Sequence, residues 1–552
     1  MNDRIPRSQN TLSQADQMLQ PTDDPWRTVG MRFPELGVGG HEAGSLVYSS
    51  ASRMKSFATT AAILSLCSEH VLALPGRSYQ SKELASKSYQ DSITIEGLLT
   101  HAKKWQEFAS SANGSRSFES EGYKLSANYV YDLAKQSGYK VTRQTVEFPR
   151  SKIHSQELKI NDQVFGPGEV LALTYSPSTP KEGITAGLAL VLDEPNTFIG
   201  SGCHRDDYDG LDVRRAIVFM SANGCSLANK VAVAKRARAL GVVIYNDIPG
   251  QGPFQGQISL NASESLPTVM IGFDAAQSFV KKLRASEFPD RVNVTMKIDS
   301  STENVKSDNI IAQTPWGDQN NVIHIGANLD SSTASPGVND NGSGSAAIAE
   351  LLVQLAKFKP SKNAVRFSWW TNGKTGSIGS EHYVKSLSKA EKKKTALYID
   401  VNTIASPNYI YGIYDGCNAS EYNTVTPPPG SSALQKLFQE DFESKALPWT
   451  NFAFNTSSDY NAFLKAGIPV GGLSTGTTGF KSEVQVAKFG GQFDVVFDKC
   501  FERACDNIDN LSKDALLVNA RSIAHVIATT AQSTNGIDAE KAARGKKVET
   551  QV

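Results

Sequence analysis

The clearest pattern of hydrophobic and polar positions in this chain lies at residues 322–355. Residues 322–325 are mostly apolar and are typical of a short buried strand, and a polar stretch follows them. Beyond this stretch, apolar residues recur at helical spacing: Ala346, Ala347, Ile348, Leu351, Leu352 and Leu355. The spacing predicts a helix that begins near Ser343, with Asp340 and Asn341 in the loop just before it. Because α/β enzymes place their chemistry where a strand, a polar loop and a helix N-terminus follow one another, this segment is the candidate site.

The N-terminal part of the chain lacks such a pattern. Residues 1–53 are rich in Asp, Pro, Ser and Gln and show no helical or strand period, so we expect them to be disordered or an artefact of the gene model. Residues 54–73 have the layout of a secretory signal peptide, with an apolar run from Phe57 to Leu66 and the small Ala73 at the cleavage point. The alternative is a short amphipathic segment of a cytosolic protein. The signal peptide predicts a secreted or vacuolar protein.

Length and composition narrow the possible classes of protein. At 552 residues the chain exceeds a single hydrophobic core and is expected to divide into domains. Its 56 basic and 56 acidic residues balance, which argues against a nucleic-acid partner. No apolar run reaches the ~18 residues that a transmembrane helix needs, so we expect no membrane span.

The candidate site resembles a known family. It contains GANLDS and then VNDNGSG, and so is similar to the co-catalytic dizinc aminopeptidases of the aminopeptidase Y and fungal secreted leucine aminopeptidase type, whose pattern is G-A-H-L-D-S followed by N-D-N-G-S-G. The resemblance implies two zinc ions, their ligands and a glutamate that takes a proton from water. The family's first histidine ligand falls on Asn328. Its bridging aspartate falls on Asp340 and is intact.

The other positions that the resemblance assigns to the site are substituted. WWTNGKTG stands where the family has W-W-G-A-E-E, which places Gly373 at the general base and Lys374 at a ligand. DVNTIASPN places Asn402 at a ligand aspartate, and FDKCFERACDN places Glu502 at a ligand histidine. Asp340 is therefore the one family ligand that is kept. Because two carboxylates that face a lysine make a poor zinc site, no cofactor is predicted.

The resemblance also implies the fold and its divisions. It predicts an α/β fold, with a mixed, mostly parallel sheet flanked by helices and an inserted β-rich protease-associated domain. GCHRDDYDG and the strand, glycine-cysteine turn and helix after it carry the likeness to that inserted domain, which would act as a lid or spacer or would contact peptide. The predicted boundaries are 93–164 for the first part of the peptidase-like domain, 165–302 for the inserted domain, 303–532 for the main peptidase-like domain and 533–552 for a flexible tail.

Cysteines and glycosylation sequons fit a secretory route. The resemblance pairs Cys500 with Cys505 and Cys203 with Cys225, and it leaves Cys417 over. Sequons of the form N-x-S/T mark candidate glycosylation sites at Asn113, Asn261, Asn293, Asn418, Asn455 and Asn510.

The substitutions lead to two hypotheses of function. The first is a catalytically degenerate secreted aminopeptidase homologue, a pseudopeptidase, that binds peptides or a protein partner. The alternative is a zinc metallo-aminopeptidase that removes N-terminal residues from peptides, with residual or altered metal chemistry. Because unpaired buried charges are costly, we expect the Lys374 ammonium to lie within about 4 Å of the Asp340 carboxylate, as a fixed cation where a zinc ion would sit. His324, four residues before Asn328 on the same strand, is expected to pack or to form a hydrogen bond.

Overall fold

A computed structural model of the chain describes residues 82–191, 200–259, 261, 264–284, 292–420, 422–455 and 457–549. The predicted disordered segment 1–53 and signal peptide 54–73 lie outside the described residues. The strands are β1 (Lys140–Ile160), β2 (Gln163–Phe165), β3 (Val170–Ala172), β4 (Ile184–Leu190), β5 (Ile217–Ser221), β6 (Gly241–Tyr245), β7 (Thr268–Ile271), β8 (Asn293–Gln313), β9 (Asp318–Asn328), β10 (Asn363–Trp370), β11 (Thr395–Val401), β12 (Gly412–Tyr414), β13 (Thr450–Phe452) and β14 (Val470–Ser474). They join in the order β13-β12-β14-β11-β9-β10-β8-β4-β5-β6-β7-β3, with β1 paired to β8 and β2.

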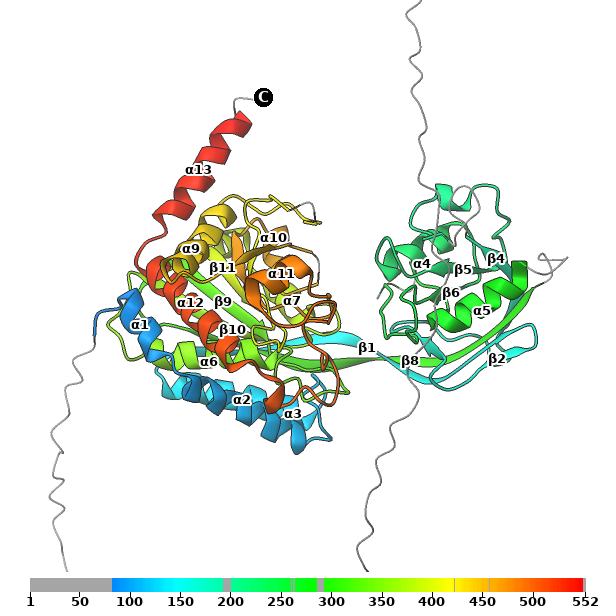
Figure 1. Cartoon of the computed structure of the whole chain (residues 1–552), viewed down its shortest axis with the longest axis horizontal. Helices are drawn as coiled ribbons and strands as arrows, with labels where there is room; N and C mark the ends of the chain where they lie inside the picture. The colour runs from blue at the N-terminus through cyan, green and yellow to red at the C-terminus, as the bar shows by residue number, and fades with distance from the viewer. Residues whose placement is uncertain are drawn as a thin grey trace, which may run out of the picture. The chain divides into compact units, whose positions relative to one another are not determined.

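The helices of the same residues cover the sheet and complete the α/β fold (Figure 1). They are α1 (Ser86–Ser92), α2 (Ile95–Ser110), α3 (Glu121–Gln136), α4 (Leu227–Arg236), α5 (Phe273–Arg284), α6 (Gly342–Leu355), α7 (Ile378–Ser386), α8 (Lys389–Lys394), α9 (Ser431–Ser444), α10 (Tyr460–Lys465), α11 (Glu483–Phe489), α12 (Lys513–Gln532) and α13 (Asn535–Glu549). The expected fold class is confirmed, because β9, β10, β11 and β14 are parallel to one another, whereas β8 is antiparallel to β10 and β12 is antiparallel to β14.

The predicted strand and helix at the candidate site form β9 and α6. The Asn341 side chain caps α6 by accepting a hydrogen bond from the Gly344 backbone N–H at 3.2 Å. Both faces of α6 are buried, as its apolar and small residues require, and Trp369 of β10 donates its indole N–H to Ser345 of the helix at 3.1 Å. The N-terminus of α6 is thereby fixed at the end of β9, where the site residues lie.

Successive side chains of the central strands pack in two separate hydrophobic cores, one on each face of the sheet. Phe367 and Trp369 of β10 pack on one face, in the core that includes residues of α2, α3, α6 and α12. Trp370 points to the other face, in the core that includes residues of α7 and α10. His324 is fully buried on this second face among aromatic rings, and its Nε2 lies 2.7 Å from Ser368 Oγ. The prediction that His324 packs and forms a hydrogen bond is confirmed.

The inserted domain is built on β4, β5, β6, β7 and β3, with α4 and α5 packed against them. Strands β4, β5, β6 and β7 are parallel to one another. Every residue of β5, β6 and β7 is buried, which explains their continuous apolar runs in the sequence. The chain enters and leaves this domain through β1 and β8, which pair in antiparallel fashion over most of their 21 residues each.

The C-terminal segment differs from the prediction. Residues 533–552 were expected to form a flexible tail because they are charged, but helix α13 spans Asn535–Glu549. Ile537 is buried in the main core, and Lys541 Nζ donates to the Ala396 carbonyl at 2.8 Å. The Glu540 carboxylate accepts a hydrogen bond from the Ala433 backbone at 2.8 Å. One apolar anchor and these two bonds attach the first turns of α13 to the domain.

Candidate active site

All six residues that the resemblance assigns to ligand and base positions line one pocket of about 370 Å³. They are Asn328, Asp340, Gly373, Lys374, Asn402 and Glu502. Asn328 ends β9, the Gly373 loop follows β10, and Asn402 follows β11, so the carboxyl ends of three neighbouring parallel strands supply them. Residues that the resemblance assigns to one site therefore do lie together in the fold, at the edge of the sheet where α/β proteins bind ligands.

Lys374 lies at the centre of the charges in this pocket. Its Nζ donates a hydrogen bond to Asp340 Oδ2 and lies 3.7 Å from Glu502 Oε1. The ammonium is also 5.2 Å from the centre of the Phe501 ring, where a cation is attracted to the ring face. The expectation that Lys374 lies within about 4 Å of Asp340 is confirmed.

Burial and charge have opposite effects on these groups. Burial alone would lower the pKa of Lys374, but the nearby Asp340 and Glu502 carboxylates outweigh it, so the pKa of this lysine is raised. Lys374 is therefore charged at neutral pH. Removal from water raises the pKa of Glu502, and the Lys374 cation partly opposes that rise. The Glu502 side chain is 45% exposed and that of Asp340 only 2%, so Glu502 is the carboxylate that solvent reaches.

The two asparagines that the resemblance assigns to ligand positions are held by other protein groups. Asn328 donates to the Asp330 carbonyl at 3.0 Å, and its Oδ1 accepts from Asn341 at 3.0 Å. Asn402 donates to Ser458 Oγ at 2.9 Å, and its Oδ1 accepts from Thr403 Oγ1 at 2.9 Å. Their oxygens are thus already engaged in hydrogen bonds.

Gly373 stands where the family has its base, and the space around it is closed. A Cβ at this position would lie 2.4 Å from Asn328 Cβ, closer than real atoms approach. The Gly373 and Lys374 backbone N–H groups donate to the Asp330 carboxylate at 2.8 and 3.2 Å. Asp330 therefore holds the loop that carries Lys374. A residue larger than glycine at position 373 would fit only if the backbone or Asn328 moved.

The residues present do not fit two zinc ions. Zinc in proteins takes sulfur, imidazole nitrogen and carboxylate oxygen ligands. Here the Lys374 ammonium contacts both Asp340 and Glu502, and Asp459 is the third carboxyl side chain of the lining. The cation position beside Asp340 is taken by Lys374 Nζ. Across the residues that the structure describes, no group of three or more His, Cys, Asp or Glu side chains could hold a metal ion.

Several buried carboxyl groups around the pocket were not singled out from the sequence. Asp459 lines the pocket and accepts a hydrogen bond from Ser380 at 2.7 Å, and burial raises its pKa well above the usual value. Asp506 accepts bonds from the Asn339 and Asp340 backbone N–H groups at 2.8 and 3.0 Å, which fixes the loop before α6. Asp506 lies in the FDKCFERACDN stretch that carries the resemblance, but nothing in the spacing of Asp459 or Asp506 marks either residue as a support of the site.

The disulfides agree with the prediction. Cys500 is bonded to Cys505, which closes the short loop that presents Glu502, and Cys203 is bonded to Cys225. Cys417 is free and exposed.

The predicted glycosylation at Asn510 does not fit the structure. The Asn510 amide donates to the Asp498 carboxylate at 3.0 and 3.1 Å and to Asp506 Oδ1 at 3.2 Å, so its nitrogen is engaged inside the fold. The other candidate sequon asparagines are exposed, and their glycosylation stays a prediction.

Comparisons with known proteins agree with this architecture. Residues 309–527 match the model of peptidase family M28, and residues 187–279 match the PA domain. The chain is 35% identical over 479 residues to leucine aminopeptidase 2 of Arthroderma otae, which covers 86% of this chain and 92% of that protein. It is 34% identical to a probable leucine aminopeptidase 2 of Aspergillus oryzae, over 84% of this chain and 89% of that protein.

Solved structures resemble the fold as well. The aminopeptidase from Aneurinibacillus sp. strain AM-1 superposes with a TM-score of 0.64 at 23% identity, covering 81% of this chain and 97% of that one. A zinc aminopeptidase from Bacillus subtilis gives a TM-score of 0.57 at 19% identity, with 81% and 96% covered. At these identities the likeness describes the fold.

Proposed function

The chain belongs to peptidase family M28, and from that membership we propose that it hydrolyses the bond after the N-terminal residue of peptides, by chemistry altered from that of two zinc ions. The observation that carries the proposal is the alignment with a leucine aminopeptidase over 92% of that protein's length. The pocket at the ends of β9, β10 and β11 is the part of this chain that would do the chemistry.

This proposal corrects the first hypothesis of the sequence analysis. A pseudopeptidase that only binds peptides or a partner was expected, because the general base and four of five ligands are replaced. The relatives that align with 81–86% of this chain are instead named as leucine aminopeptidases. A hydrolase therefore replaces a purely binding protein as the function to test.

The altered chemistry rests on Glu502 and Lys374. Glu502 is the more solvent-accessible of the two carboxylates that contact Lys374, and its raised pKa suits a group that takes up a proton. In the proposed reaction Glu502 accepts a proton from water as the water oxygen bonds to the peptide carbonyl carbon. The Lys374 ammonium opposes the negative charge on the carbonyl oxygen. The proton then passes from Glu502 to the leaving amine as the carbon–nitrogen bond breaks.

The pocket also suits the positive end of a peptide. Asp340 and Glu502 together outnumber the single ammonium of Lys374, so the cluster of these three side chains carries a net negative charge. A free amino terminus brings the positive charge that would balance it. Peptides with a blocked amino terminus lack this charge and should be poor substrates.

We propose that the protein works in the secretory pathway or outside the cell. Two disulfides support this, because such bonds persist in oxidising compartments. Within the described residues no helix is both long enough and apolar enough to cross a membrane. Peptide or protein ligands are the proposed partners, and nucleic acid is not.

Hydrolysis of leucyl-p-nitroanilide by the purified full chain tests the proposal. We expect turnover that survives the chelator 1,10-phenanthroline and is lost in Glu502→Gln, with Lys159→Gln as an exposed control that leaves turnover unchanged. Turnover that the chelator abolishes would retain the aminopeptidase activity and refute the altered chemistry. No turnover of any aminoacyl substrate, with or without added zinc, would refute the function itself.

A further inference from the structure

We propose that the inserted domain binds an acidic polypeptide segment in a pocket lined by arginine side chains. The pocket has a volume of about 730 Å³, and its histidine, arginine and carboxylate lining residues are His204, Arg205, Asp209, Arg214, Arg236 and Arg238. Every lining residue belongs to the inserted domain, so this site is distinct from the pocket of Lys374. The proposal does not rest on the hydrolase function.

The four arginines of this pocket form no ion pair within the described part of the chain. None of their guanidinium groups forms an ion pair or a hydrogen bond there, and all four side chains are exposed. By contrast, Arg143 and Arg150 each pair with a carboxylate, and Arg116 is held by backbone carbonyls. Asp209 is the single carboxylate of the lining. Four like charges around one hollow repel one another, so an anion that enters lowers the energy of all of them.

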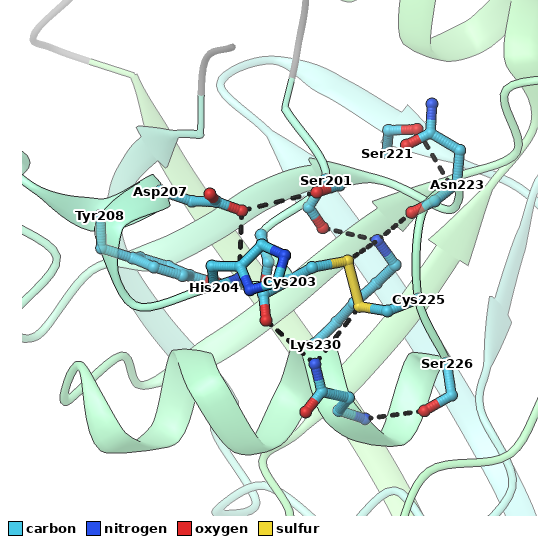
Figure 2. Close-up of a disulfide and its surroundings, with 12 residues drawn as sticks. Ser201, Cys203, His204, Asp207, Tyr208, Ser221, Asn223, Cys225, Ser226 and Lys230 are labelled. Carbon is cyan, nitrogen blue, oxygen red and sulfur yellow. Dashed lines mark hydrogen bonds between the residues drawn. A yellow bond between two sulfur atoms is a disulfide. The ribbon is translucent and has the colours of Figure 1, made fainter.

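A disulfide and the hydrogen bonds of a buried lysine fix the backbone at the rim of the pocket. The Cys203–Cys225 disulfide attaches the segment that carries Arg205 to the residue before the α4 N-cap, as Figure 2 shows. Beneath it, the buried Lys230 of α4 donates to the Ser201 carbonyl at 2.6 Å and to the Asn223 carbonyl. A site whose backbone is fixed before binding loses less entropy when a ligand arrives.

The remaining arginines are placed by α4 and by the loop before β5. Arg236 is the last residue of α4, and Arg238 lies in the turn that follows. The Arg215 backbone N–H donates to the Arg238 carbonyl at 3.3 Å, which holds the Arg214 loop against this turn. Three separate chain segments thus bring their guanidinium groups to one hollow.

The chemistry of the lining favours a polypeptide among anionic ligands. Tyr208, Val213 and Val233 are largely buried and contribute apolar surface between the charges. Guanidinium groups bind carboxylates through two parallel hydrogen bonds, and the apolar surface suits the aliphatic stems of glutamates. A nucleic acid would need a wide positive field, whereas this chain has equal numbers of basic and acidic residues.

Fluorescence anisotropy with the full chain and labelled peptides tests the proposal. The probe is an acetylated ten-residue peptide of alternating Glu and Leu, whose blocked amino terminus makes it a poor ligand for the Lys374 pocket. The comparison peptide replaces every Glu by Gln. We expect the Glu peptide to bind at least about tenfold more tightly, and raising salt from 0.05 to 0.5 M to weaken it, because screening reduces attraction between exposed charges.

Paired substitutions locate the binding. Arg214→Gln with Arg236→Gln should weaken the Glu peptide about tenfold or more, since each removes a charge-assisted contact. Lys159→Gln with Lys281→Gln removes the same charge from two exposed residues of the chain outside the pocket and should change nothing. Equal loss in both pairs would refute the assignment, as would full retention in the arginine pair. Complete competition by millimolar inorganic phosphate, or tighter binding of a single-stranded DNA of equal charge, would also overturn the choice of an acidic polypeptide.

Discussion

Replacing Lys374 by methionine removes the cation beside Asp340 while keeping most of the side-chain volume. Asp340 Oδ2 then loses the ammonium. The remaining side-chain donor to this carboxylate is the Thr403 hydroxyl, whose single proton is shared between Asp340 Oδ1 at 3.2 Å and Asn402 Oδ1 at 2.9 Å. The Asp340 side chain is 2% exposed, so water does not replace the lost charge. Removal of one partner from a buried ion pair typically costs about 3–5 kcal/mol.

This cost can be converted to a melting temperature. An unfolding entropy of ~2.1 cal/mol/K per residue gives a total unfolding entropy of about 1 kcal/mol/K for the roughly 450 described residues, taken as one cooperative unit. A loss of about 3–5 kcal/mol then lowers the melting temperature by about 3–5 °C. Glu502→Gln should lower it less, because that carboxylate is 45% exposed and lies 3.7 Å from the ammonium.

Differential scanning fluorimetry of four proteins at one scan rate measures the effect. They are the parent, Lys374→Met, Asp340→Asn and the double variant. Because the double variant leaves no uncompensated charge at Asp340, we expect it to regain most of the stability that either single change removes. A Lys374→Met melting temperature within 1 °C of the parent, or additive losses in the double variant, would refute the idea that this pair neutralises the pocket.

Three further predictions concern metal, pH and cysteines. Lys374→Glu should lower the melting temperature without metal, and added zinc should raise it in the variant more than in the parent, because zinc would bind the added carboxylate; equal zinc responses would contradict this. Burial raises the pKa of Asp400 to about 7, so its contribution to stability is full near pH 4 and falls by up to about 4 kcal/mol as pH rises through 7. Asp400→Asn should therefore show a smaller loss of stability than the parent between pH 5 and pH 8 in denaturant titrations. Alkylation without reduction should label Cys417, and label on Cys500 would count against the disulfide assignment.

The sequence predicted the parts of the molecule that depend on local pattern. A short apolar run and helical spacing were sufficient to predict the buried part of β9 and helix α6, which begins after the capping Asn341. The Lys374–Asp340 contact followed from alignment together with the cost of unpaired charge. The first prediction depends on residues that are close in sequence. The second depends on residues in the loops that follow two neighbouring strands, β9 and β10.

Features that depend on distant contacts could not be predicted. The closeness of Gly373 to Asn328 arises from two neighbouring strands, and no pattern within either segment shows it. Helix α13 has a charged sequence, and only its contacts with β11 and α9 explain why it is ordered against the domain. The arginine pocket likewise gathers residues from three segments of the inserted domain.

The long pairing of β1 with β8 has a consequence for how the protein is made. About 130 residues separate the end of β1 at Ile160 from the start of β8 at Asn293, and the intervening chain holds the strands and helices of the inserted domain. During synthesis from the N-terminus, the ribosome therefore releases the whole inserted domain before β1 can meet its partner. The central sheet can be completed only after that, so we expect nascent chains truncated before residue 293 to expose an unpaired β1 edge and to need chaperones.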